Sequence, residues 1–220
     1  MTDLNLLLTA IAEDLGDPST WVVPVEFPES LALCALNSVY SLNNSSTAAK
    51  NVLARYRAFR PTADTDSGPD LMEAMDSAGG PRDFAVNILR NERPLARSQR
   101  VRPEGIYEGL SKLAALNTAI TTAEHLRTAA AAENTAAQEA WLSVKGFGPL
   151  AWSYLLMNAG VGTETKPDVM IQRYLARALR DPKVPGPDRT RQLLQLAAKA
   201  LSVEPRDLDR AIWQYESPSK

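Results

Sequence analysis

Cysteine and histidine are almost absent from this sequence of 220 residues. The one cysteine, Cys34, cannot form an internal disulfide, and the apolar stretch SLALCALNSVY around it favours a buried, unreactive thiol. One cysteine and one histidine, His125, are too few to hold a zinc finger or an iron–sulfur cluster. We therefore expect no metal cluster, no other metal site and no cofactor.

Long hydrophobic runs are also missing, although hydrophobic residues make up 45% of the chain. No stretch approaches the roughly 20 apolar residues that a membrane-spanning helix needs. The first residues, MTDLNLLLTAIAEDLGD, carry acids where a signal peptide would carry lysines. These features predict a cytoplasmic monomer without membrane contact, associated with the nucleoid if its source is bacterial.

The net charge of −2 excludes a generally basic protein, but the charges are unevenly distributed. Residues 1–80 carry four basic and eleven acidic side chains, whereas residues 81–180 carry thirteen basic and nine acidic ones. A basic middle can place a positive face on a protein that is acidic overall. The alternative is that these charges simply cover solvated helices.

Alternation of β-branched residues, which is typical of strands, is missing too, and helix breakers recur at short intervals. We predict an all-α protein of about a dozen short helices. They are expected at residues 2–15, 28–42, 48–59, 71–79, 81–91, 103–120, 121–134, 135–144, 150–160, 168–180, 188–201 and 205–216.

The most informative segment lies between two of these helices and reads Val144-Lys145-Gly146-Phe147-Gly148-Pro149-Leu150-Ala151. Two glycines allow the backbone to approach another surface without a Cβ atom in the way. Free amides at the start of the helix that follows can bind an anion such as a DNA phosphate. An ordinary pair of helices joined by a glycine turn would have the same composition.

The order apolar-x-Gly-apolar-Gly-x-x-Ala in this segment resembles the DNA-binding helix-hairpin-helix. Downstream, Lys166-Pro167-Asp168-Val169 leads into an expected helix that carries Arg173. Together these features resemble the helix-hairpin-helix (HhH-GPD) superfamily of base-excision DNA glycosylases, which includes endonuclease III and the alkyladenine glycosylases. The resemblance extends over about residues 29–180, and Ser41-Leu42-Asn43 is similar to a Ser-x-Gln turn of that family.

The resemblance implies two helical lobes flanking a cleft. The first would be a central bundle of residues 29–143. The second would combine residues 1–28 with residues 144–220 and contain the helix-hairpin-helix at about 134–160.

The resemblance also implies a hydrolase for base excision repair that flips a damaged or modified base out of double-stranded DNA and cuts its N-glycosidic bond. Members that also cleave the DNA backbone carry a lysine two residues past the second hairpin glycine. Leu150 stands there in this chain, so no amine can form a Schiff base at that position. A monofunctional glycosylase is expected.

Asp168 matches the catalytic aspartate of the family, whose carboxylate would stabilise positive charge on the sugar. The alternative is that Asp168 only caps the helix that follows it. A larger set is expected to contact DNA: Lys145, Gly146, Phe147, Gly148, Lys166, Arg173, Arg97 and Arg100. The last two belong to the arginine-rich stretch 82–102, which is otherwise a solvated loop or a partner for the acidic first third.

Base flipping also needs a wedge and a pocket with apolar or aromatic walls. Asn43 and Asn44 are the wedge candidates, and both are otherwise plain turn residues. Tyr40, Trp152 and Tyr154 are the candidates for pocket walls, although their helical spacing among leucines equally favours core packing. Two other functions stay open, namely a helix-hairpin-helix DNA-binding protein without activity and a helical interaction domain.

Overall fold

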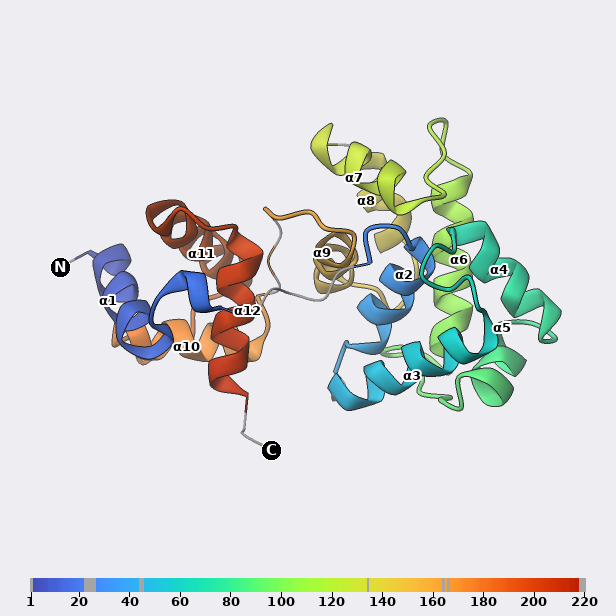
Figure 1. Ribbon diagram of the computed structural model, residues 1–220, viewed down its shortest axis with the longest axis horizontal. Coiled ribbons are helices and arrows are strands. Elements are labelled where there is room, and N and C mark those ends of the chain that lie inside the picture. The colour runs from blue at the N-terminus through green and yellow to red at the C-terminus, as the bar shows by residue number, and fades with distance from the viewer. Residues whose placement is uncertain are drawn as a thin grey trace. The chain divides into compact units, whose positions relative to one another are not determined.

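The computed structural model describes residues 2–21, 27–43, 46–133, 135–163, 165 and 167–217 (Figure 1). These residues form twelve α-helices and no strand, so the all-α prediction is confirmed. The helices are α1 (Asp3–Leu15), α2 (Leu31–Tyr40), α3 (Ser46–Phe59), α4 (Gly68–Ser77), α5 (Pro81–Asp83), α6 (Arg102–Ala114), α7 (Ala123–Ala131), α8 (Thr135–Leu142), α9 (Pro149–Asn158), α10 (Val169–Leu179), α11 (Pro187–Leu201) and α12 (Pro205–Glu216). A 3-10 turn η1 (Pro18–Thr20) and a π-helical turn η2 (Phe84–Ile88) complete the regular structure.

The starts of α1 and α2 are fixed in different ways. A local contact fixes the first, and a local and a distant contact together fix the second. The hydroxyl of Thr2 accepts the Asn5 amide at the start of α1, and threonine is a residue type favoured at such a position. The helix expected from Pro28 instead begins at Leu31. Ser30 caps it, because its hydroxyl accepts the Leu33 amide and also donates to the carbonyl of Ala63 at 2.7 Å.

The chain divides into two compact units, each with its own core. The large unit is Glu26–Val161, and the small unit combines Met1–Val25 with Gly162–Lys220. The predicted division placed residues 144–161 in the second lobe, but they belong to the large unit. The reason is packing, since Val144, Phe147 and Trp152 are part of the core of the large unit.

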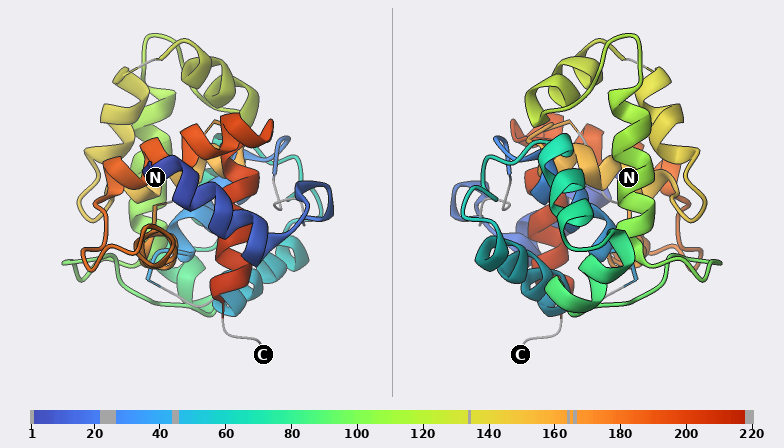
Figure 2. Two further views of the ribbon diagram at one scale, coloured as in Figure 1. Left: turned by 90° about the vertical axis from the view of Figure 1, so that its left-hand side faces the viewer. Right: turned by 90° about the vertical axis from the view of Figure 1, so that its right-hand side faces the viewer.

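In the large unit, α2 is almost entirely buried and contacts α3, α4, α6 and α9. Helix α6 runs beside α8 in both views of Figure 2. Two glycines one turn apart on α6 make this approach close. A Cβ atom on Gly109 would lie 2.7 Å from the ring of Trp141, and one on Gly105 would lie 3.3 Å from the ring of Phe147. The rings of Phe147 and Trp141 therefore pack against Gly105 and Gly109, a surface of α6 that we call the glycine notch.

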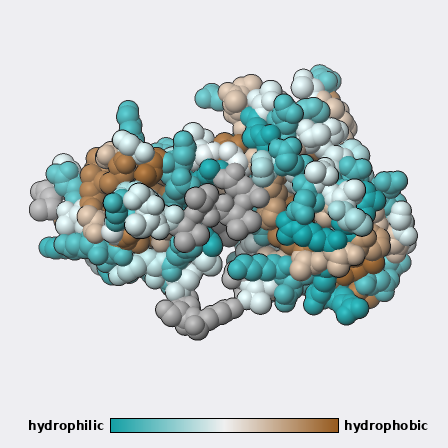
Figure 3. Space-filling view, in the orientation of Figure 1, coloured by the Kyte–Doolittle hydropathy of each residue, from teal (hydrophilic) through white to brown (hydrophobic). Residues whose placement is uncertain are grey.

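In the small unit, α1, α10, α11 and α12 pack around a separate set of buried side chains. The core of this unit contains Leu7, Ile11, Ile171, Tyr174, Leu175, Leu193, Leu194, Ala197, Ala198, Leu208 and Ile212. Figure 3 shows an apolar area over α11, where Leu196 is 43% exposed. None of the described helices combines the length and the apolar character needed to cross a bilayer.

Candidate functional site

The turn between α8 and α9 leaves several backbone amides open. The Phe147 amide donates to the Val144 carbonyl at 3.0 Å, and the Ala151 amide donates to the Gly148 carbonyl at 2.8 Å. The amides of Gly146, Gly148 and Leu150 have no acceptor among the residues that the structure describes. Open amides at the first turn of a helix attract anions, because the helix dipole places positive potential there. The turn can therefore receive a phosphate oxygen.

The two hairpin glycines face different surroundings. Gly148 has extended backbone (φ −131°), and no atom lies within 4 Å of where its Cβ would be. Gly146 has φ 101°, and its Cβ would lie 3.0 Å from Cβ of Leu95 and 3.1 Å from the carbonyl oxygen of Ala96. The open side predicted for both glycines therefore exists at Gly148, while the chain itself covers that side of Gly146.

The side chains of this turn have separate tasks. Phe147 is buried and packs against Trp141, with 4.7 Å between the ring centroids. It anchors the turn, and its amide already donates to Val144, so neither its ring nor its amide is free for the predicted contact with DNA. Lys145 is exposed and makes no hydrogen bond or ion pair with any residue that the structure describes. It is the free cation of the turn.

The structure distinguishes the two arginines predicted from the stretch 82–102. Arg97 is exposed. Arg100 instead pairs with Glu108 at 2.7 Å and donates to the Glu104 carbonyl at 2.9 Å. The Lys112 ammonium, and after it the Arg100 guanidinium, lowers the pKa of the Glu108 carboxyl. Arg100 thus fastens the stretch to α6, whereas Arg97 is open to a ligand.

Arg102 was not singled out from the sequence, yet it holds the end of α2. It is buried, and it donates to the carbonyl of Val39 and, at 2.7 Å, to that of Leu42. Its guanidinium also lies over the Tyr40 ring, 5.4 Å from the centroid. Burial, and then the nearby Arg93, lowers the pKa of Arg102 to about 10. An arginine at the start of α6 gives no local signal of a partner in α2.

The candidates for the wedge and the pocket walls differ in how exposed they are. Asn43 is exposed, with left-handed backbone (φ 48°) directly after the carbonyl that Arg102 binds. Tyr40 and Trp152 are core residues, and the Tyr40 hydroxyl donates to the Asn91 carbonyl at 3.2 Å. Tyr40 therefore has no surface for a base in this structure. Tyr154 is half-buried on α9. Asn44 and Lys166 lie outside the described residues.

Asp168 is the N-cap of α10 in the small unit. Its Oδ1 accepts the amides of Met170 at 2.9 Å and Ile171 at 3.2 Å. Its Oδ2 has no hydrogen-bond donor among the described residues, and the side chain is half-buried. The carboxylate is thus held in one orientation, with one oxygen that no described residue binds.

The start of α12 fastens the segment that leads to Asp168. The Arg206 amide donates to the Gly162 carbonyl at 3.3 Å. A Cβ atom on Gly162 would meet the Glu204 carboxylate, 2.9 Å from its Cδ. These residues also gave no signal in the sequence, because the contact joins distant parts of the chain.

Two further residues near the start of α10 are open to solvent. Val169 is 54% exposed. Arg173 is exposed four residues later and pairs with no described residue. Residues at this spacing share one helix face. An apolar and a cationic side chain therefore lie on the same side of α10.

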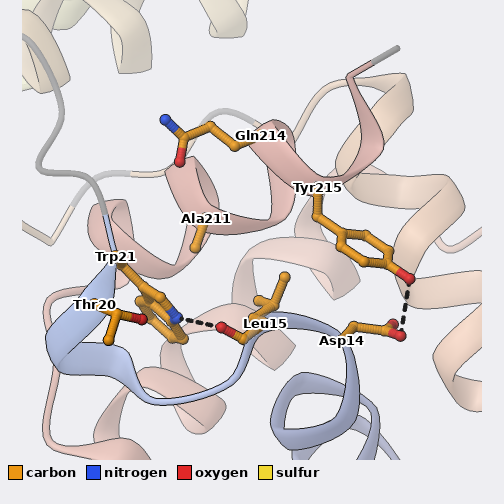
Figure 4. A pocket seen from close by; sticks show the side chains of 7 residues that line it. All are labelled: Asp14, Leu15, Thr20, Trp21, Ala211, Gln214 and Tyr215. Carbon is orange, nitrogen blue, oxygen red and sulfur yellow. Dashed lines mark hydrogen bonds between the residues drawn. The ribbon is translucent and has the colours of Figure 1, made fainter. Parts of the chain in front are cut away.

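A hollow of about 230 Å³ lies elsewhere in the small unit (Figure 4). Two pairs of its lining groups already bind each other, since Tyr215 donates to Asp14 at 3.0 Å and Trp21 to the Leu15 carbonyl at 3.1 Å. Asp14 also pairs with Arg177 of α10. Arg177 is nine residues beyond Asp168, or roughly 13 Å along the helix. The hollow is therefore separate from Asp168, and no predicted pocket residue lines it.

The chain matches one described protein family over residues 5–217. No curated protein and no solved structure gives a match. The matched region contains both the hairpin turn and Asp168, as well as the helices of both units. The chain belongs to the family described as a domain of unknown function, DUF8548.

Proposed function

We propose that this protein is a monofunctional DNA glycosylase of the helix-hairpin-helix type. The open amides of Gly146, Gly148 and Leu150 would bind a phosphate of the DNA backbone. Asp168 would act on the nucleotide that is flipped out of the duplex. The fold, the substrate and the reaction are all part of this proposal.

The observation that supports the proposal most directly is the fixed orientation of the Asp168 carboxylate. Two amides hold Oδ1, so the group cannot rotate freely, while Oδ2 has no donor among the described residues. Loss of the base builds positive charge on the sugar, and a fixed negative oxygen stabilises that charge. The same oxygen can accept a proton from the water that adds to the sugar.

The first experiment identifies the reaction. Duplex oligonucleotides, each with a single damaged or modified base, are incubated with the protein and then treated with hot alkali, which cuts the strand at an abasic site. Cleavage after alkali, and none before it, is the expected result, because Leu150 provides no amine. Borohydride should trap no covalent complex. A trapped adduct would refute the monofunctional assignment and leave the role of Asp168 standing.

Asp168→Asn tests the catalytic role, because asparagine caps a helix about as well as aspartate but has no charge. We expect normal folding and DNA affinity, with base release slowed by about a hundredfold or more, measured in single-turnover assays. Asp17→Asn is the matched control, since Asp17 caps η1 through the Ser19 amide at 2.8 Å. Asp17→Asn should leave the rate unchanged, and full activity of Asp168→Asn would exclude Asp168 from the chemistry.

A DNA-binding protein without activity is the second candidate. It is favoured by the same cap, because two amide bonds account for Asp168 without any reaction. Under this alternative the protein binds undamaged duplex but releases no base from the whole set of oligonucleotides. The two functions are therefore separated by base release alone.

A further inference from the structure

Residues 94–101 form a small closed loop in the large unit, which we call the Arg97 loop. Pro94 and Val101 pair as an antiparallel bridge, and the Leu95 amide donates to the Arg100 carbonyl at 2.8 Å. Arg97 lies within this closed loop, with left-handed backbone at φ 55°. The loop is thus held by its own backbone, and its conformation does not depend on a ligand.

The Arg97 loop is attached to the hairpin turn. Leu95 and Ala96 fill the space that a side chain on Gly146 would need, with contacts of 3.0 and 3.1 Å to the missing Cβ. Leu95 also lies against Gly105 of α6, where a Cβ would be 2.5 Å from its Cδ1. The loop and the turn therefore meet at a fixed point, and the glycine at that point has φ 101°.

The two exposed cations at this junction are Arg97 and Lys145, each next in sequence to a residue of the contact. Neither makes a hydrogen bond or an ion pair with the residues that the structure describes. Acids on the neighbouring α6 are already paired, Glu104 with Arg82 at 3.3 Å and Glu108 with Arg100 at 2.7 Å. The junction is therefore positively charged, although the protein is acidic overall.

We propose that the Arg97 loop and the hairpin turn form one surface that binds neighbouring phosphates of a DNA duplex. The hairpin amides and Lys145 would contact one phosphate, and Arg97 would contact another, with the planar fork that suits a phosphate. This inference rests on the proposed function for its choice of DNA as the partner. It requires no base release.

The test measures binding of an undamaged, fluorescently labelled duplex over a series of KCl concentrations. The slope of log K against log salt is negative, and each phosphate contact adds about 0.9 to its magnitude. Arg97→Gln and Lys145→Gln should each lower the magnitude of the slope by about that amount and weaken binding about tenfold. The double variant should lower the magnitude of the slope by about twice as much. Arg180→Gln is the matched control, because Arg180 is exposed, lies in the small unit and has the same φ of 55°. It should bind as the parent does.

The outcomes separate this surface from the enzymatic function. If Arg97→Gln binds with the parent's affinity and slope, or if Arg180→Gln loses as much as Arg97→Gln, the Arg97 loop is not part of the surface. If the slopes change as expected but no base is released from any oligonucleotide, the surface stands and the glycosylase proposal fails. A parent protein that does not bind duplex overturns both.

Discussion

Single buried polar residues in the large unit fix loops between its helices. Arg102 is the strongest example, because one side chain satisfies the carbonyls of Val39 and Leu42 at the end of α2. The turn that carries Asn43 starts there. A substitution of Arg102 should therefore lower the free energy of unfolding and also shift the position of that turn.

Arg102→Leu keeps most of the side-chain volume but removes the donor of the Leu42 carbonyl and one donor of the Val39 carbonyl, which still accepts the Leu42 amide at 3.3 Å. We expect the free energy of unfolding to fall by about 2–4 kcal/mol, measured by urea denaturation. Arg102→Lys should fall by less, since an ammonium still donates but lacks the fork of the guanidinium. Arg180→Leu is the exposed control and should change stability by under about 0.5 kcal/mol. An equally small loss for Arg102→Leu would mean that the carbonyls find water.

At the scale of elements, the hairpin joins two helices and is held from outside by α6. The notch at Gly105 and Gly109 accepts the rings of Phe147 and Trp141. The Arg97 loop covers one glycine of the turn and leaves the other open. The covered Cβ side of Gly146 therefore serves the fold, while the open Cβ side of Gly148 is available to a ligand.

Gly148→Val should fold with the stability of the parent, because no atom lies within 4 Å of the new Cβ and the backbone is extended. It should nevertheless bind duplex DNA at least about tenfold more weakly, since the side chain blocks a phosphate. Gly146→Val should instead lose about 1–3 kcal/mol of stability, because valine is strained at φ 101°. Thermal denaturation and duplex binding distinguish the two effects. Normal binding by a folded Gly148→Val protein would make the hairpin purely structural.

At the scale of the whole molecule, each of the two units is stabilised by its own cluster of buried residues. Hydrogen exchange of the native protein tests how far each core acts by itself. Leu194→Ala in the small unit and Leu36→Ala in the large unit both truncate fully buried side chains. Each should cost about 2–5 kcal/mol, because each leaves a cavity. Protection should fall mainly in the helices of the altered unit, and an equal loss in both units would indicate a single cooperative structure.

The local code along the chain accounts for most of the helices. Missing alternation of β-branched residues and helix breakers at short intervals were enough to predict the all-α class. The predicted helix 205–216 matches α12, because Pro205 and the amphipathic spacing act within the helix itself. Asp168 could be found in the same way, since it directly precedes the helix that it caps.

Tertiary structure decided which of these local features meet. Ser30 replaced Pro28 as the start of α2 because a hydroxyl can bind the distant Ala63 carbonyl as well as its own helix. The hairpin joined the large unit because its aromatic side chains fit a glycine notch in α6. Arg97 and Arg100 are alike in sequence, yet only the position of Glu108 pairs one and leaves the other open. Sequence patterns report forces that act within a few residues, whereas these choices depend on contacts that exist only once the chain has folded.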